Sequence, residues 1–182
     1  MIPFPDKKYQ IIVVDPPWKL AKVKQNLRKF NKPASFNDID YPMMSLDEIK
    51  SLPIGDIAGD KCMLFLWTID KYLYNTKPIL EHWGFKYHVT LAWDKTNGIA
   101  MYGFNRQTEF VLVGLKGKHD AYPARKTIRT SFSAKSERHS AKPDYFYEML
   151  DVLDGDRIDI FARKPRTGLF INNKWDVWGN EV

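Results

Sequence analysis

The residues best suited to chemistry in this chain form the tetrapeptide Asp15-Pro16-Pro17-Trp18. A carboxylate and a neighbouring backbone carbonyl can each accept one hydrogen from the exocyclic amine of a nucleobase, which leaves the nitrogen lone pair directed at an electrophile. The prolines have a fixed φ and so hold both acceptors in place. Trp18 can stack on the base or wall it, and the base must be unstacked because its amine cannot be reached inside a duplex.

The tetrapeptide follows four β-branched apolar residues, Ile11 to Val14, which are typical of a strand buried on both faces. Neither proline has an N–H for a sheet ladder, so we expect the strand to stop and the carbonyls of Asp15 and Pro16 to be free. The carboxyl end of a strand is where open α/β sheets bind ligands. The alternative is a purely structural turn built from two prolines.

Further strands and helices alternate along the chain. Ser45 with Glu48 three residues later forms a capping box, which predicts a helix that ends near Leu52. The chain as a whole predicts an α/β fold with a mostly parallel sheet, helices on both faces and a single domain over residues 1–182. Further strands are expected at 62–67, 86–93, 109–115 and 157–163, helices at 70–83 and from Pro143 to about Leu153, and a polar corner at 94–98.

Positive charge is concentrated in two segments. Lys19 to Lys32 contains six lysines and arginines and no acid, and Lys116 to Arg138 contains seven against two acids. Clustered cations of this kind are typical of nucleic-acid contacts, although a solvated surface made for solubility is the plain alternative. The candidate contacts are Lys22, Lys24, Arg28, Arg125 and Arg129.

Composition excludes several other classes. The chain has one cysteine, Cys62, in an apolar run, so no disulfide can form within it and a buried, inert thiol is expected. The four histidines show no metal-ligand spacing, and we expect no metal. No signal peptide or membrane span is evident, so we expect no membrane association and a location in an intracellular, reducing compartment.

The tetrapeptide and a series of ordered blocks resemble the MT-A-seventy family of adenine-N6 methyltransferases, from Tyr9 almost to the end of the chain. Met43 replaces the threonine usual in the family, and the segment from Gly168 to Trp175 is longer than in relatives. The blocks are Tyr41-Pro42-Met43-Met44-Ser45, Phe65-Leu66-Trp67, Trp93-Asp94-Lys95-Thr96-Asn97, Val113-Gly114-Leu115-Lys116-Gly117, His139-Ser140-Ala141-Lys142-Pro143-Asp144, Ile158-Asp159-Ile160-Phe161-Ala162-Arg163 and Trp178-Gly179-Asn180-Glu181.

The resemblance implies a Rossmann-like methyltransferase fold with permuted motif order, S-adenosyl-L-methionine as methyl donor, and adenine N6 of DNA or RNA as acceptor. It implies that Lys142 lies near the methionine carboxylate or the target adenine. The catalytic residues it implies are Asp15, Pro16, Pro17 and Trp18. The cofactor-binding residues it implies are Asp15, Lys142, Asp159, Phe161, Arg163, Asn180 and Glu181, and the substrate-binding residues are Tyr41, Trp93, Lys95, Glu109, Ser140 and Lys142.

Several alternatives stay open at this point. The plain alternative is a side chain that faces water for Lys142, Asp159 and Arg163. For Glu109 it is a charged residue at a strand edge. For Trp93 and Tyr41 it is packing in the core. The compact length, the absence of an RNA-binding module and the Trp178-Gly179-Asn180-Glu181 ending resemble bacterial and phage members of the family that modify DNA. We therefore favour DNA over RNA and expect a location in the cytoplasm of a bacterial or phage-infected cell. A non-catalytic nucleic-acid-binding subunit and a cytosine-N4 methyltransferase are the rival functions, and family precedent is compatible with a homodimer or a related partner subunit. With no sizeable domain ahead of the first strand, we expect Ile2-Pro3-Phe4 or a partner to hold the adenine end of the cofactor.

Overall fold

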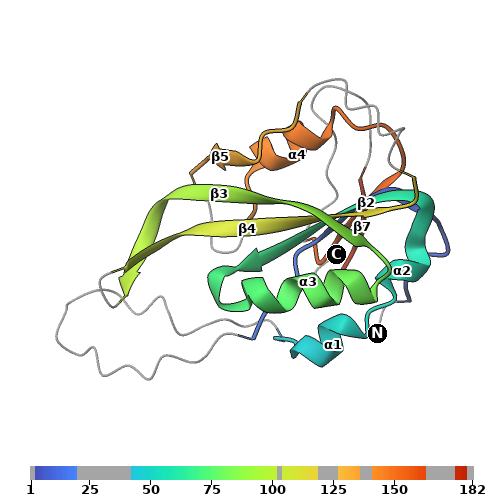
Figure 1. Cartoon of the computed structure of the whole chain (residues 1–182), viewed down its shortest axis with the longest axis horizontal. Coiled ribbons are helices and arrows are strands. Elements are labelled where there is room, and N and C mark those ends of the chain that lie inside the picture. The colour runs from blue at the N-terminus through green and yellow to red at the C-terminus, as the bar shows by residue number, and fades with distance from the viewer. Residues whose placement is uncertain are drawn as a thin grey trace.

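A computed structural model describes residues 3–19, 42–101, 104–118, 127–135, 141–162 and 175–179. These residues form a seven-stranded sheet in the order β5-β3-β4-β2-β1-β6-β7 (Figure 1). The strands are β1 (Tyr9–Val14), β2 (Ala58–Ile69), β3 (Lys86–Met101), β4 (Phe104–Lys116), β5 (Ser131–Ser133), β6 (Arg157–Ile160) and β7 (Asp176–Trp178). The helices are α1 (Leu46–Lys50), α2 (Ile54–Ile57), the 3-10 helix η1 (Asp70–Tyr72), α3 (Leu73–His82) and α4 (Asp144–Leu150).

The sheet is mostly parallel, as the alternation of strands and helices predicts. β1 pairs in parallel with β2 on one side and β6 on the other, and β6 with β7 and β3 with β5 are parallel as well. β4 is antiparallel to both of its neighbours, β2 and β3. The carboxyl end of β1 therefore lies beside the carboxyl ends of β2 and β6.

Helices cover both faces of the sheet, and the side chains of β1 alternate between the two cores. Ile12 and Val14 pack with residues of α1, α2 and α3, whereas Ile11 and Val13 pack with residues of α4. All four are at most 2% exposed. Burial of a β-branched side chain contributes about 1.5–3 kcal/mol, so β1 is anchored from both sides and its end is a rigid platform.

The predicted elements are present, with differences at their ends. The capping box of Ser45 and Glu48 begins α1, and the predicted helix over 70–83 is split into η1 and α3, followed by Gly84 at φ 85°. β6 ends at Ile160, three residues earlier than predicted, because Phe161 adopts φ 70° and leaves the strand conformation.

The prediction of a polar corner at 94–98 is wrong, because β3 continues to Met101. The strand accommodates the polar residues through an irregularity: Asp94 pairs with Thr108 but Ile99 pairs with Arg106. Thr96 has φ 58°, and its N–H donates to Asp94 Oδ1 at 2.9 Å. Irregularities of this kind bend a strand and redirect its side chains, which is common next to functional sites.

Among the residues that the structure describes, no helix combines the length and the apolar character needed to cross a bilayer.

Candidate active site

The tetrapeptide lies directly after β1, at the carboxyl edge of the sheet. The Asp15 N–H donates to Ile160 O at 3.2 Å, which ties the start of the motif to β6. The expectation of a free Pro16 carbonyl is wrong, because the Trp18 N–H donates to it at 2.8 Å. The Met44 N–H donates to Pro17 O at 2.9 Å, and Trp18 and Met44 form a parallel bridge. These bonds hold the backbone of the motif in one conformation.

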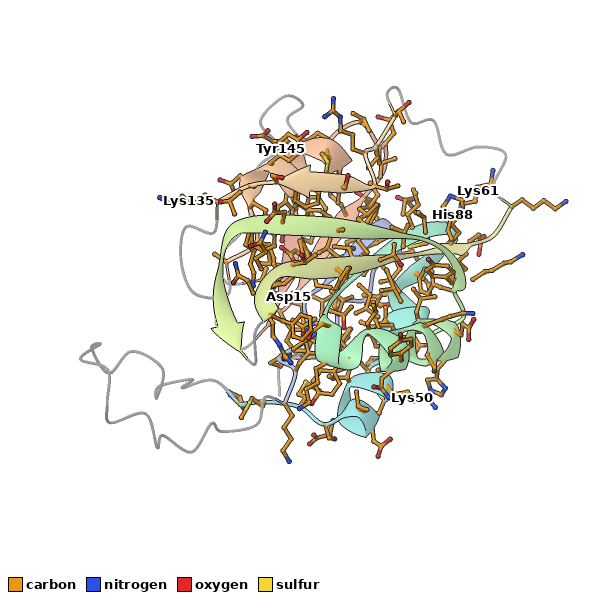
Figure 2. All side chains as sticks on the ribbon, turned by 60° about the vertical axis from the view of Figure 1, so that its left-hand side comes forward. Asp15, Lys50, Lys61, His88, Lys135 and Tyr145 are labelled. Carbon is orange, nitrogen blue, oxygen red and sulfur yellow. The ribbon has the colours of Figure 1, made fainter. Side chains whose placement is uncertain are left out.

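Lys142 joins two acidic side chains that are far apart in the sequence. Its Nζ lies 3.0 Å from Asp15 Oδ1 and 3.0 Å from Glu109 Oε2. Lys95 Nζ contacts the other oxygen of Glu109 at 3.2 Å. The side chains of Lys142, Glu109 and Asp15 are 9%, 16% and 23% exposed, so the group is largely withdrawn from water. We call Asp15, Lys142, Glu109 and Lys95 the polar cluster, and Figure 2 shows Asp15 within the curve of β3 and β4.

The charges of the cluster support one another. Burial opposes the charged form of Lys142, but the carboxylates of Asp15 and Glu109 prevail and raise the pKa of this lysine above its ordinary value. Burial likewise opposes the charge on Glu109, and the two lysines beside it lower the pKa of its carboxyl. The Lys142 ammonium also lies 5.0 Å from the centre of the Trp67 ring, at cation–π distance. At neutral pH the lysine is therefore protonated and Glu109 ionised.

Trp18 and Trp93, which were predicted to contact the target base, are both buried, so neither exposes a ring face for a base. Trp18 is 7% exposed, stacks on Tyr72 at a ring distance of 5.1 Å, and donates its indole N–H to Trp67 O at 3.1 Å. Trp93 is 1% exposed, packs edge to face with Trp67, and donates to Ala134 O at 2.9 Å. The core-packing alternative therefore describes Trp93, and Trp18 acts as a support under the motif rather than as a free stacking surface.

The structure places Asp159 and Phe161 near the end of β6. Asp159 is 2% exposed and accepts a hydrogen bond from the Tyr147 hydroxyl at 2.8 Å, so the alternative that it faces water is wrong. Phe161, just beyond β6, packs against Trp178 at a ring distance of 5.6 Å, and Phe4 packs against Trp178 at 4.2 Å. These three rings form an aromatic group beside the carboxyl ends of β6 and β7.

Other predicted site residues are not brought to the cluster or lie outside the described residues. Arg129 is exposed on the segment that leads into β5. The predicted residues outside the described ranges are Lys22, Lys24, Arg28, Tyr41, Arg125, Ser140, Arg163, Asn180 and Glu181.

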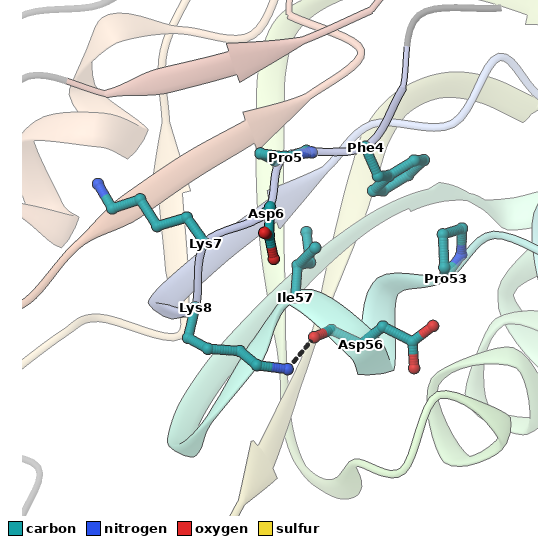
Figure 3. Close-up of a pocket in the computed structure, with 8 residues that line it drawn as sticks. All are labelled: Phe4, Pro5, Asp6, Lys7, Lys8, Pro53, Asp56 and Ile57. Atoms are coloured by element: carbon teal, nitrogen blue, oxygen red, sulfur yellow. Dashed lines mark hydrogen bonds between the residues drawn. The ribbon is translucent and has the colours of Figure 1, made fainter.

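A separate pocket lies beside the N-terminal segment (Figure 3). It contains none of the polar-cluster residues, and its one bond drawn in the figure joins Lys8 Nζ to Asp56 O. The residues that line this pocket are Phe4, Pro5, Asp6, Lys7, Lys8, Pro53, Asp56 and Ile57.

Within the described part of the chain, no group of three or more histidine, cysteine, aspartate or glutamate side chains is arranged to hold a metal ion.

Sequence reasoning missed two residues of this region. Trp67 is fully buried, forms the ring under Lys142, and accepts the indole bond of Trp18 through its carbonyl; Tyr72 covers the face of Trp18. The Phe65-Leu66-Trp67 block was the available signal for Trp67, but an apolar run inside a strand predicts only burial. Nothing in the local sequence of η1 distinguishes Tyr72.

Comparisons with known proteins place this geometry in a family. The model of the MT-A70 family matches residues 9–181. The Type II methyltransferase M.MunI of Mycoplasma sp. is 34% identical over 98% of this chain and 79% of its own length. The human N(6)-adenine-specific methyltransferase METTL4 is 24% identical over 97% of this chain, and the human N(6)-adenosine-methyltransferase catalytic subunit METTL3 is 25% identical over 96%. The chain spans only 38% and 28% of the lengths of these two human proteins.

Proposed function

The chain belongs to the MT-A70 family, and from this premise we propose that it is an S-adenosylmethionine-dependent methyltransferase acting on the N6 amine of adenine in nucleic acid, with DNA favoured. The observation that carries the proposal is the ion pair of Asp15 with Lys142 at the carboxyl end of β1, where ligands of open α/β sheets bind. Such a strand end, with a rigid acceptor-rich motif and a buried cation, suits a polar substrate that must be held in one orientation.

Asp15 and Pro16 accept the two hydrogens of the target amine. A carboxylate has about four acceptor positions and a carbonyl has two, so Asp15 can pair with Lys142 and Pro16 can accept the Trp18 N–H while each also takes an amine hydrogen. The bonds of the motif to β6 and to Met44 fix both acceptors before the base arrives. Preorganised acceptors of this kind need no rearrangement during reaction, which is where such sites gain rate.

Lys142 and Glu109 set the electrostatics around these acceptors. Lys142 pairs with the Asp15 carboxylate at 3.0 Å, and a carboxylate accepts hydrogen bonds but does not donate them. Glu109, held between Lys95 and Lys142, adds a third fixed acceptor on the side of β4. After transfer the substituted amine loses a proton to solvent, so no residue of the cluster has to act as a strong base.

The residues present fit S-adenosylmethionine. Phe4 and Phe161, which are only partly buried and pack on Trp178, offer apolar surface for its adenine, and Lys142 offers a cation for its carboxylate. A Cβ at Gly179 would lie 3.1 Å from Phe161 Cα, so the chain after β7 passes very close to the end of β6. When bound, the cofactor supplies an electrophilic methyl group.

DNA is favoured because the M.MunI match covers most of both chains, whereas the match to the adenosine methyltransferase METTL3 covers 28% of that protein. The test is a methyl-transfer assay on single-stranded DNA, duplex DNA and RNA oligonucleotides, followed by mass analysis of the product nucleosides. N6-methyladenine in DNA is the expected product. N6-methyladenosine in RNA would select the RNA alternative, and N4-methylcytosine would overturn the proposed base.

A non-catalytic nucleic-acid-binding subunit is the alternative of a different class. Calorimetry with S-adenosylmethionine separates the two, because the proposed enzyme binds the cofactor as an isolated chain. Absence of both cofactor binding and methyl transfer would favour the subunit.

A further inference from the structure

The paired strands β3 and β4 extend beyond the rest of the sheet on the side of the polar cluster. The pairing of β2 with β4 ends where Ile69 meets Glu109, but β4 begins five residues earlier, at Phe104. The residues from Phe104 to Thr108 therefore pair only with β3, and Figure 1 shows the two strands running past the end of β2. We call this projecting part of β4, Phe104–Thr108, the arm.

One face of the arm continues the polar cluster. Side chains alternate along a strand, so Asn105 and Gln107 lie on the same face of β4 as Glu109. The Asn105 side-chain amide donates to Gln107 Oε1 at 2.8 Å, and Gln107 Nε2 donates to Asp94 Oδ1 at 3.1 Å. Asp94 is itself fixed by the irregularity of β3 through its bond with the Thr96 N–H. The amide of Gln107 is therefore held in one orientation from both ends.

This arrangement leaves Gln107 with a defined capacity for further hydrogen bonds. A side-chain amide has two N–H donors and two acceptor positions on its oxygen. Asp94 takes one donor and Asn105 takes one acceptor position, so one N–H and one acceptor position remain on the same amide. An amide offering a donor beside an acceptor is the partner that adenine N7 and N6 require.

The spacing of Gln107 from Glu109 along β4 matches the spacing between a target base and its neighbours along a nucleic acid. Gln107 is two residues from Glu109, which corresponds to about 7 Å along a strand. Successive bases in a stacked strand are about 3.4 Å apart, so Gln107 reaches the first or second base beyond the target. Phe104 lies three residues farther along the arm.

Phe104 is a second feature that suits a nucleic acid. Its side chain is 76% exposed, so a base that covered the ring would remove apolar surface from water. Arg106, on the same face of β4 as Phe104, is half exposed and pairs with Asp70 at 3.5 Å. An exposed ring beside a cation is a platform on which an unpaired base stacks.

We propose that the arm reads the nucleic-acid strand next to the target adenine: Gln107, oriented by Asn105 and Asp94, hydrogen-bonds an adenine one or two positions away. Phe104, at the end of the arm and on its opposite face, stacks on a base farther along, where the nucleic-acid strand passes around that end. The proposal rests on the proposed function for the identity of the target but assigns the flanking contact to a different set of residues. It places sequence preference in the arm rather than in the two basic segments alone.

The test measures binding and methyl transfer separately on single-stranded DNA oligonucleotides that carry one target adenine and each of the four bases at the two positions on either side. Fluorescence anisotropy gives the dissociation constants, and product nucleosides give the rates. The wild-type chain is expected to bind and methylate substrates with adenine at one flanking position about tenfold better than the other three. Gln107→Ala should reduce this preference below about twofold, and thermal unfolding confirms that the variant is folded.

Phe104→Ala tests the stacking contact. It should weaken oligonucleotide binding about tenfold for every flanking base while S-adenosylmethionine binding is unchanged. Tyr74→Ala is the matched control, because Tyr74 is an aromatic residue of α3 that is 90% exposed and lies outside the arm. The control should bind oligonucleotides as the wild type does.

The outcomes distinguish this inference from the proposed function. Methyl transfer by the wild type with no flanking preference, an unchanged preference in Gln107→Ala, or equal effects of Phe104→Ala and Tyr74→Ala would each overturn the inference and leave the proposed function intact. Flank-dependent binding that is lost in Gln107→Ala, without any methyl transfer, would support the arm and overturn the proposed function.

Discussion

Replacing Lys142 with methionine removes the charge that Asp15 and Glu109 share while keeping a side chain of similar length. Glu109 retains its contact with Lys95 at 3.2 Å, but Asp15 loses the cation that lies 3.0 Å from its Oδ1. Since the side chain of Asp15 is only 23% exposed, its carboxylate is then poorly compensated by water. We expect Lys142→Met to destabilise the fold as well as the site.

The size of the effect follows from the burial of the pair. Removing one partner of a buried ion pair costs about 3–5 kcal/mol, against a total folding free energy of about 5–15 kcal/mol. For a chain of this length each kcal/mol lowers Tm by about 2–4 °C, so Lys142→Met should lower Tm by about 6–20 °C. Lys95→Met is the matched control. Lys95 contacts one carboxylate and is 23% exposed, so its removal should cost less than half as much.

A double-mutant cycle with Asp15→Asn identifies the cause. If the cost of Lys142→Met comes from the Asp15 carboxylate that has lost this cation, replacing the carboxylate with a neutral amide should recover about 1–3 kcal/mol. Urea unfolding of the wild type, the two single variants and the double variant measures this recovery. Unfolding free energies that simply add in the double variant would refute the reasoning. So would a Lys95→Met variant as unstable as Lys142→Met.

Three further predictions concern the fold and its titration. Ser45→Ala removes the capping box of α1 and should lower Tm by about 2–4 °C without changing methyl transfer; an unchanged Tm would show that the cap adds nothing. Burial raises the pKa of the Cys62 thiol to about 12, so iodoacetamide at pH 8 should modify Cys62 in urea but not in the native protein, as followed by intact mass. The pKa of the Glu109 carboxyl is lowered from 4.5 in the folded protein. Its contribution to the unfolding free energy is therefore present above pH 4.5 and is lost as the pH falls through the pKa of the folded state. The pKa of Lys142 is raised from 10.5 in the folded protein. Its contribution to the unfolding free energy is therefore complete below pH 10.5 and is lost as the pH rises through the pKa of the folded state. Urea unfolding from pH 3 to 11 should therefore show a loss on the acid side that Glu109→Gln reduces, and an equal acid loss in that variant would contradict the assignment.

The position of the motif could be predicted because local chemistry dictates it. Four β-branched residues form a strand buried on both faces, and two prolines end that strand. The capping box at Ser45 and the left-handed Gly84 after α3 are signals of the same local kind. Each was confirmed, and for β1 the packing against α1, α2, α3 and α4 agrees with the local preference.

The contacts of the site depend on tertiary structure and could not be predicted in the same way. Lys142, just before α4, meets Asp15, just after β1, and Glu109 of β4 in space, and spacing along the chain does not reveal this. Trp18 has the residue type of a stacking platform, but the neighbouring Tyr72 covers it.

The extension of β3 was missed for a related reason. The polar run from Asp94 to Gly98 has the composition of a turn, yet pairing with β4 carries the strand through it at the cost of an irregular register. That extension is what projects the arm.

The measurement that tests the central claim most directly is the yield of N6-methyladenine from a folded Asp15→Ala variant. The variant is compared with the wild type by mass analysis of nucleosides after incubation with S-adenosylmethionine and single-stranded DNA, with Tm recorded for both. We predict a loss of about a hundredfold to a thousandfold in methyl transfer, because the variant lacks one of the two fixed acceptors for the amine. Normal N6-methyladenine production by a folded Asp15→Ala variant would contradict the account.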